Sequence, residues 1–237
     1  MGNVHLLKFY LFIATFFLAV TCVHAQQTPL PKTDQNFDLA VGLGENSQTS
    51  YSLSWNKNHG LFSSKKLRLG YGIRFSGFSG KELYYITAPA DLTGEDATID
   101  TLSMGKANTM ALNALINIQY QFHPKFKAGF NIDALGLGFG GDKNAVFISS
   151  ENTGQFPERL SASPTSFNAL LGGDNDLGQL KSEFYLAYAV SQNTWLRAGF
   201  DLTFSEYTTE QNLSFENDRF RNKAMLFFVA ISYNPFK

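Results

Sequence analysis

Nine charged residues stand at alternating positions among small polar and apolar residues, and both signs of charge occur among them. They are Asp38, Arg68, Arg74, Lys127, Asp133, Lys181, Glu183, Arg197 and Asp201. Charged groups of opposite sign that share one dry space can form ion pairs, relay protons or line an ion path. The chemistry of this set therefore depends on the fold that brings it together.

Two interpretations of the charged set stay open. If the strands predicted below close into a barrel, the set is either a salt-bridge network that fills this barrel or the lining of a gated pore or proton path. An unpaired buried charge is costly, and an eight-stranded barrel is only wide enough for its own side chains. We favour the salt-bridge network, with Arg68, Lys127 and Arg197 near one end of the barrel and Asp38 as their partner.

The histidines argue against catalysis. Enzymes built on membrane barrels commonly use a His near Ser, Asp or Glu, because imidazole titrates near neutrality. Past the N-terminal segment the chain has His59 and His123, and both fall on predicted short turns. There is no His or Cys cluster with metal-ligand spacing. We therefore predict no enzyme, no catalytic residue, no cofactor and no metal site.

An acidic cluster, Gly172–Asp176, ends the longest predicted loop. Asp and Asn oxygens are suitable calcium ligands, but the spaced acids and closing Glu of a calcium loop are missing. A turn built on Gly and Asn is the better interpretation.

Apolar and polar residues alternate along stretches of about ten residues, which is the side-chain period of a β-strand. From Lys66 to Phe78, for example, Leu67, Leu69 and Tyr71 would share one face. The pattern predicts an all-β fold, an antiparallel up-and-down barrel of about eight strands. Their expected ranges are Phe37–Gly44, Ser50–Asn56, Lys66–Phe78, Thr109–Phe122, Phe126–Leu137, Leu180–Val190, Trp195–Tyr207 and Ala224–Tyr233.

The predicted connections alternate between short and long. The short ones are His59–Lys65, His123–Lys125 and Ser191–Thr194, and the long ones are Lys81–Asn108, Phe139–Gln179 and Thr208–Lys223. Only Glu45–Thr49 is short where a long loop is expected. Outer-membrane barrels have short periplasmic turns and long external loops. The order therefore predicts periplasmic termini and extracellular long loops; a ten-stranded barrel would need a hairpin within one of the long loops.

The composition of the two faces separates a transmembrane barrel from a soluble one. A soluble barrel would point its apolar face inward and expose a charged face, yet here the polar face is mostly small residues. Charged residues form 16% of the chain and aromatic residues 15%, against about 25% charged residues in soluble domains. Aromatic residues near the short turns predict an interfacial girdle, made of Trp55, Phe122, Phe126, Tyr188, Trp195, Tyr233 and Phe236.

The N-terminus has the features of a secretory signal peptide. Lys8 precedes the apolar run Phe9–Val20, and Val23-His24-Ala25 is typical of a cleavage site. We predict a signal peptide over residues 1–25, a periplasmic tail over 26–35 and the barrel over 36–237. Lipid attachment at Cys22 is the weaker alternative. Export and the strand pattern together predict a bacterial outer-membrane location.

The long loops are not purely polar, so simple disorder is a poor description of them. They either pack over the barrel mouth or dock on a partner, and Ser163, Pro164 and Gly172 could bound a short helix. The predicted extracellular contact residues are Tyr84, Tyr85, Phe147, Phe156, Phe167 and Leu170.

The chain resembles the small outer-membrane β-barrel superfamily that includes OmpX and the OmpA transmembrane domain, and most of all its Bacteroidota-type group. The stretches that carry the likeness are Ser163–Asn168, Gly173–Asp176 and Trp195–Gly199, within a span from Phe37 to Phe236. The chain departs from the pattern where Lys237 follows the terminal aromatic Phe236. The resemblance implies a fold and a Gram-negative outer membrane, but no specific activity.

The sequence favours an integral outer-membrane protein with a binding or structural role, of which one form is an accessory subunit of an outer-membrane complex. The alternatives are a small pore or transporter and a lipid-modifying enzyme. We expect outer-membrane lipid as a partner, with an outer-membrane protein as a further one. No nucleic acid is expected, because the formal net charge is −1 and no basic stripe exists.

Overall fold

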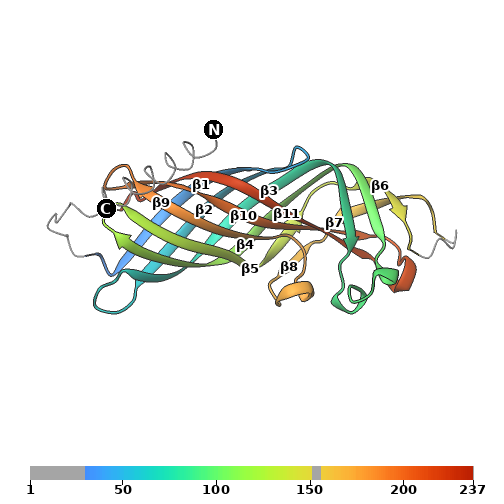
Figure 1. Ribbon diagram of the computed structural model, residues 1–237, viewed down its shortest axis with the longest axis horizontal. Coiled ribbons are helices and arrows are strands. Elements are labelled where there is room, and N and C mark those ends of the chain that lie inside the picture. Colours follow the sequence, from blue (N-terminus) through green and yellow to red (C-terminus); the bar gives the residue numbers. More distant parts are fainter. Residues whose placement is uncertain (1–29, 151–155, 237) are drawn as a thin grey trace, which may run out of the picture.

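Eight strands form a closed antiparallel ring in the computed structural model, which describes residues 30–150 and 156–236 (Figure 1). Each strand pairs with the next in the ring and β11 closes it by pairing with β1. The eight are β1 (Thr33–Leu43), β2 (Thr49–Gly60), β3 (Leu67–Thr87), β4 (Thr101–His123), β5 (Phe126–Phe139), β9 (Leu180–Ala189), β10 (Thr194–Thr209) and β11 (Arg219–Tyr233).

The ring agrees with the predicted barrel, and the total strand count does not. The part of the chain that the structure describes holds eleven strands, because β6 (Lys143–Ile148), β7 (Arg159–Pro164) and β8 (Phe167–Ala169) lie within the longest predicted loop. The β6–β7 hairpin pairs with β4 and β10 only beyond the ring. It therefore does not widen the barrel to ten strands.

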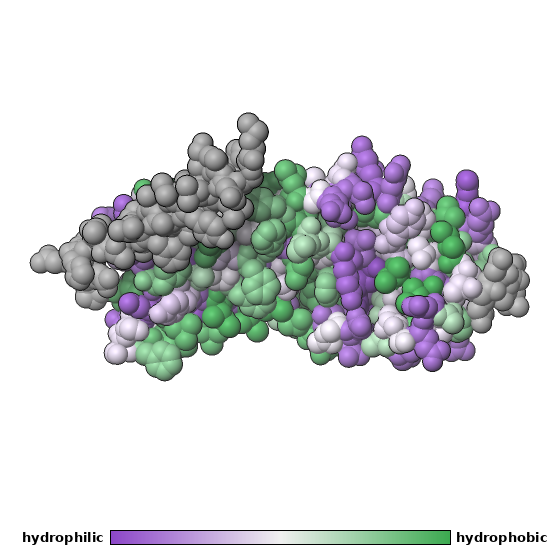
Figure 2. All heavy atoms as spheres, in the orientation of Figure 1, coloured by the Kyte–Doolittle hydropathy of each residue, from purple (hydrophilic) through white to green (hydrophobic). Residues whose placement is uncertain are grey.

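The ring points its apolar side chains outward. On β1, Phe37, Leu39 and Val41 are 44–59% exposed, while the alternate residues Asp38 and Ala40 are buried. In Figure 2, the visible surface of the ring is mostly hydrophobic, whereas the surface of the extension is mixed and richer in hydrophilic residues. This arrangement is the reverse of a soluble barrel. The outward apolar belt also includes Leu196, Phe200, Leu202, Met225, Phe227, Val229 and Ile231.

One expected girdle residue lies elsewhere. Trp195 is only 9% exposed and faces the interior, because its neighbour Leu196 takes the outward position on β10. The prediction that Trp195 belongs to an interfacial girdle is therefore wrong.

Beyond the ring, six strands continue as a second, smaller closed sheet. β3, β4, β6, β7, β10 and β11 pair in this order, and β11 closes the sheet onto β3 through Phe220–Thr87 and Arg221–Ile86. We call this part the extension; it lies around β6 and β7 in Figure 1. It has an apolar core of Phe78, Leu83, Tyr85, Leu102, Met104, Ala107, Ala145, Phe147, Ala162, Tyr207, Leu213, Phe220, Ala224 and Leu226.

A kink in β3 and β4 marks the junction of ring and extension. Glu82 adopts a left-handed backbone with φ of 52°, opposite Gly105. Lys81 and Glu82 are both exposed, as are Gly105 and Lys106, so the in–out alternation of both strands shifts by one residue. Such irregularities bend a sheet and redirect its side chains. Here they turn Leu83 and Met104 into the core of the extension.

Three sequence-based expectations are corrected. The segment Ser163–Gly172 is not a helix, because it contains the end of β7 and all of β8. Thr33–Gln35, expected as tail, belong to β1. The predicted loops Lys81–Asn108 and Thr208–Lys223 are shorter than expected, because β3 and β4 include residues 81–87 and 101–108, and β10 and β11 include residues 208–209 and 219–223. The signal peptide, its cleavage site and Cys22 lie outside the described residues.

Four short 3-10 helices interrupt the connections of the described chain: Ala90–Leu92, Asp96–Thr98, Gly173–Asn175 and Ser214–Glu216. Among the described residues, no helix is long and apolar enough to cross a membrane.

Candidate functional site

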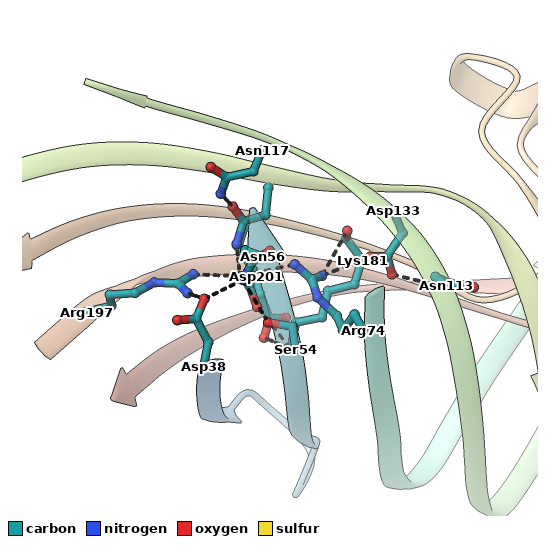
Figure 3. Close-up of polar contacts among 12 residues, drawn as sticks. Asp38, Ser54, Asn56, Arg74, Asn113, Asn117, Asp133, Lys181, Arg197 and Asp201 are labelled. Atoms are coloured by element: carbon teal, nitrogen blue, oxygen red, sulfur yellow. Dashed lines mark hydrogen bonds and ion pairs between the residues drawn. The ribbon is translucent and has the colours of Figure 1, made fainter. Parts of the chain in front are cut away.

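The structure places all nine predicted charged residues inside the barrel. Each has an exposed fraction of 8% or less. They reach the interior because each occupies an inward position of a ring strand, where the side chain opposes the apolar belt. Figure 3 shows how several of them point toward one another from different strands.

Glu183 on β9 is the centre of the network. Its Oε2 atom lies 3.2 Å from Nη2 of Arg74 and 2.8 Å from Nη2 of Arg197, and it accepts a hydrogen bond of 2.8 Å from Nδ2 of Asn131. Its Oε1 atom lies 3.9 Å from Nζ of Lys181. One carboxylate therefore ties four strands, β3, β5, β9 and β10.

Further acids complete the neutralisation of these three bases. Asp133 lies 3.2 Å from Nη1 of Arg74, Asp201 lies 2.8 Å from Nζ of Lys181, and Asp38 forms an ion pair with Arg197. The guanidinium of Arg197 also stacks on a ring, with Cζ 3.9 Å from the centroid of Tyr185. Every charge at this level has an opposite charge beside it.

Two more bases occupy the end that carries the short turns. Nη1 of Arg68 lies 2.9 Å from Asp34, and its Nη2 donates to the carbonyl oxygen of Pro31 at 2.7 Å. Nζ of Lys127 donates to Gln119 at 3.0 Å and lies 4.6 Å from the ring centroid of Trp195. Of the three bases predicted to meet Asp38, the structure brings only Arg197 to it.

Among the described residues, the formal charges inside the ring balance. Five basic residues (Arg68, Arg74, Lys127, Lys181 and Arg197) face five acidic ones (Asp34, Asp38, Asp133, Glu183 and Asp201). A balanced, hydrogen-bonded set offers no excess field to attract a mobile ion.

Two small cavities lie among the described residues of the interior. A cavity of about 20 Å³ lies between the network and the extension, lined in part by Thr109, Lys181 and Thr203. Another of about 20 Å³ lies at the short-turn end beside Arg68 and Trp195. Each has room for about one water molecule.

The extension closes the far end with aromatic side chains. The rings of Tyr85 and Tyr207 meet edge to face with centroids 5.1 Å apart. Tyr85 hydrogen-bonds Ser205 at 2.9 Å, and the Tyr207 hydroxyl donates to the carbonyl oxygen of Asn108 at 2.8 Å. Burial raises the pKa of Tyr207 to about 12 and that of Tyr85 further. Both hydroxyls therefore stay protonated and the closure is insensitive to physiological pH.

A second ion-pair cluster fixes the β8–β9 connection to the outside of the extension. Glu206 is fully buried and accepts from Arg219 at 3.0 Å and from Arg221 at 2.8 Å. Arg221 also donates to the carbonyl oxygen of Asp176, and Gln179 bonds the Glu206 backbone at 2.6 Å. These contacts hold the β8–β9 connection against the outer face of the extension.

Both carboxylates of the acidic cluster Gly172–Asp176 already have partners within the protein. Asp176 accepts from the backbone N–H groups of Leu171 and Gly172 at 2.8 and 2.7 Å. Asp174 pairs with Lys223 at 2.7 Å, and this contact lowers the pKa of Asp174. Within residues 30–150 and 156–236, no group of three His, Cys, Asp or Glu side chains is placed to hold a metal ion.

The six predicted contact residues divide into three pairs by their exposure. Tyr85 and Phe147 are buried in the extension core, so their prediction as contact residues is wrong. Phe156 packs against the same core and Leu170 is half-buried. Only Tyr84 and Phe167 are exposed, at 62% and 49%.

Sequence reasoning missed the amides that surround the charges. Asn113 donates to Asp133 at 2.9 Å, Asn56 donates to Asp38 at 3.0 Å, and Asn131 reaches Glu183. All three occupy buried positions that alternate with the outward apolar residues of their strands, and this alternation is the signal that could have found them. Glu206 was missed because it faces outward, where no partner is visible in the sequence.

Neither a protein-family model nor a curated relative matches the sequence. Among solved structures, the chain is similar to a de novo designed transmembrane β-barrel at 10% identity and TM-score 0.36, over 89% of this chain and 99% of that one. Neisserial surface protein A is similar at 10% identity and TM-score 0.35, over 85% and 94%. The outer membrane enzyme PagL is similar at 12% identity and TM-score 0.30, over 82% and 97%. Values this low leave function to be argued from the site.

Replacement of the central carboxylate tests the network. Glu183→Gln leaves Arg74 and Arg197 without their shared counter-charge, so we expect a loss of about 3–5 kcal/mol in the free energy of unfolding. The exposed turn variant Glu45→Gln, with the same charge change, should stay within about 0.5 kcal/mol of the wild type. Urea unfolding in detergent, followed by tryptophan fluorescence, measures both. Equal midpoints for Glu183→Gln and the wild type would contradict a structural role for the network.

Proposed function

We propose that the chain is an integral outer-membrane β-barrel of a Gram-negative bacterium, non-conducting and non-enzymatic, with a binding or structural role carried by its extension. The observation that carries this proposal has two parts. The ring has an apolar belt on its outside, and its interior is filled by ion pairs and covered at one end by the aromatic-rich core of the extension. Such a molecule has no path for a solute and presents a folded surface beyond the membrane.

The height of the belt supports a membrane location. On β3 and β4, outward apolar pairs run from Leu67–Tyr120 to Gly77–Met110. Ten residues at about 3.3 Å each, tilted by about 40°, rise about 25 Å. This matches the apolar band of outer-membrane barrels. The short turns then face the periplasm and the extension faces outward, as in barrels of this kind.

A non-enzymatic role is favoured by the surroundings of the histidines. The ring of His59 stacks on Tyr71 with centroids 6.1 Å apart, and His123 accepts from the backbone N–H of Lys125 at 3.2 Å. Both lie at the short-turn end, away from the extension. Neither has a carboxylate and a hydroxyl arranged around it for proton transfer among the residues described.

An accessory subunit role is the form of binding that we favour. The extension exposes Tyr84 and Ile86 on β3 and Ile148 on β6, at 62%, 42% and 51%, on the two strands that flank β4. Aromatic and aliphatic residues in such patches commonly mark contacts. Extraction from native membranes in mild detergent should yield a stoichiometric companion protein. A monomer-sized species without a companion would leave the barrel without a subunit role.

Conductance in planar bilayers tests closure of the barrel. The wild type should give no single-channel steps, because both cavities along its interior hold about one water molecule each. The same preparation must show heat-modifiable gel migration and, in vesicles, protection from added protease. These controls ensure that an absence of current does not result from failed insertion. Regular steps from inserted protein would instead favour the pore or transporter alternative.

A pair of adjacent residues tests the assignment of faces. Phe200 is 55% exposed in the belt and Asp201 is fully buried beside Lys181. Phe200→Arg should block membrane assembly, since an arginine near the midplane costs about 2–4 kcal/mol. Asp201→Ala should assemble but lower the urea midpoint. If Phe200→Arg inserted normally while Asp201→Lys failed, the faces would be inverted.

A further inference from the structure

Two lysines lie directly opposite each other at the kink between ring and extension. Lys81 on β3 and Lys106 on β4 are Cα partners, and both are exposed. Opposed residues of an antiparallel pair have Cβ atoms about 5 Å apart, so like charges there destabilise the sheet. The pair therefore needs an anion near it or carries a cost.

No acidic side chain of the described residues neutralises this pair. Glu82 follows Lys81 and is exposed, but neither lysine forms an ion pair or side-chain hydrogen bond within the described ranges. Lys223, by contrast, is 2.7 Å from Asp174. Lys81 and Lys106 thus differ from the bases of the interior and of the Glu206 cluster, all of which have a polar or charged partner.

The position of the lysines along the strands indicates the kind of anion. The last apolar pair of the belt is Gly77–Met110, followed by Ser79–Asn108 and then Lys81–Lys106. Four residues beyond Gly77 correspond to about 13 Å along the strand and about 10 Å in height. This is the level of lipid headgroups. A lysine side chain whose Cα lies just above or just below that level can extend its ammonium group to it.

We propose that Lys81 and Lys106 together bind the phosphate headgroup of a membrane lipid, with its acyl chains along the belt below. The inference rests on the proposed membrane location. Two ammonium groups supply up to six N–H donors, and a phosphate spanning them replaces the repulsion with charge-assisted hydrogen bonds. Ser79 and Asn108 lie between the lysines and the belt, where sugar or glycerol oxygens of a lipid would sit.

Native mass spectrometry of the full protein, extracted and held in octyl glucoside, tests this site. The probes are diphosphoryl lipid A, the same lipid without phosphates, and inorganic phosphate. For Lys81→Ser/Lys106→Ser, binding of lipid A should weaken at least about tenfold, the loss expected from one charge-assisted hydrogen bond. The matched variant Lys223→Ser, with its ion pair to Asp174, should bind like the wild type, and Lys81→Arg/Lys106→Arg should retain binding.

The outcomes separate this inference from the proposed function. The dephosphorylated lipid should bind the wild type as weakly as lipid A binds the double serine variant. Undiminished lipid A binding by a double serine variant that inserts normally would overturn the lysine site alone. Displacement of lipid A by equimolar inorganic phosphate would overturn the assignment to a lipid. Failure of the wild type to insert into vesicles would overturn the membrane location itself.

Discussion

The ion pairs of Glu183 are the constraint on which the rest of the structure depends. A ring of eight strands encloses a space that its own side chains must fill, and this chain fills it with charges. Buried charges are tolerated only when each is paired and hydrogen-bonded, so Arg74, Arg197 and Lys181 must reach one carboxylate from three strands. The network therefore sets the relative register of strands that are distant in the sequence.

The extension has an apolar core, whereas the interior of the ring is charged, because the two parts have different surroundings. Once β3, β4, β10 and β11 pass the belt, their outward faces meet water and their inward faces need an ordinary apolar core. The kink at Glu82 and Gly105 makes this change possible, because it shifts the alternation of both strands at once. Six strands then enclose a core narrower than the ring, and Tyr85 and Tyr207 close it.

The ring was predictable because its strands keep a period of two over most of the belt. The exception is β5, where a register shift places Leu135 outward although Asp133, two residues earlier, is buried. The extension was not predictable, since the shift at Glu82 breaks that period and made Lys81–Asn108 resemble a loop. The helix expected at Ser163–Gly172 failed for a related reason: capping residues were visible, but the pairing of Pro164 with Tyr207 is not local. The inward positions of the nine charged residues followed from alternation, whereas their partners depend on contacts between distant strands.

The pairing of the interior charges and the exposure of charged residues at the kink have a common physical reason. The interior uses its charges in pairs, and its two cavities lined by described residues have room for about one water molecule each. Charge that serves binding is therefore expected on the outside. In the membrane location that we propose, the outside of the belt cannot carry it, because lipid contact excludes charge there. The kink is the first level at which an outward charge is allowed, and it is where Lys81 and Lys106 stand opposite each other. The closed interior that we propose is thus compatible with a binding site at the boundary between the ring and the extension.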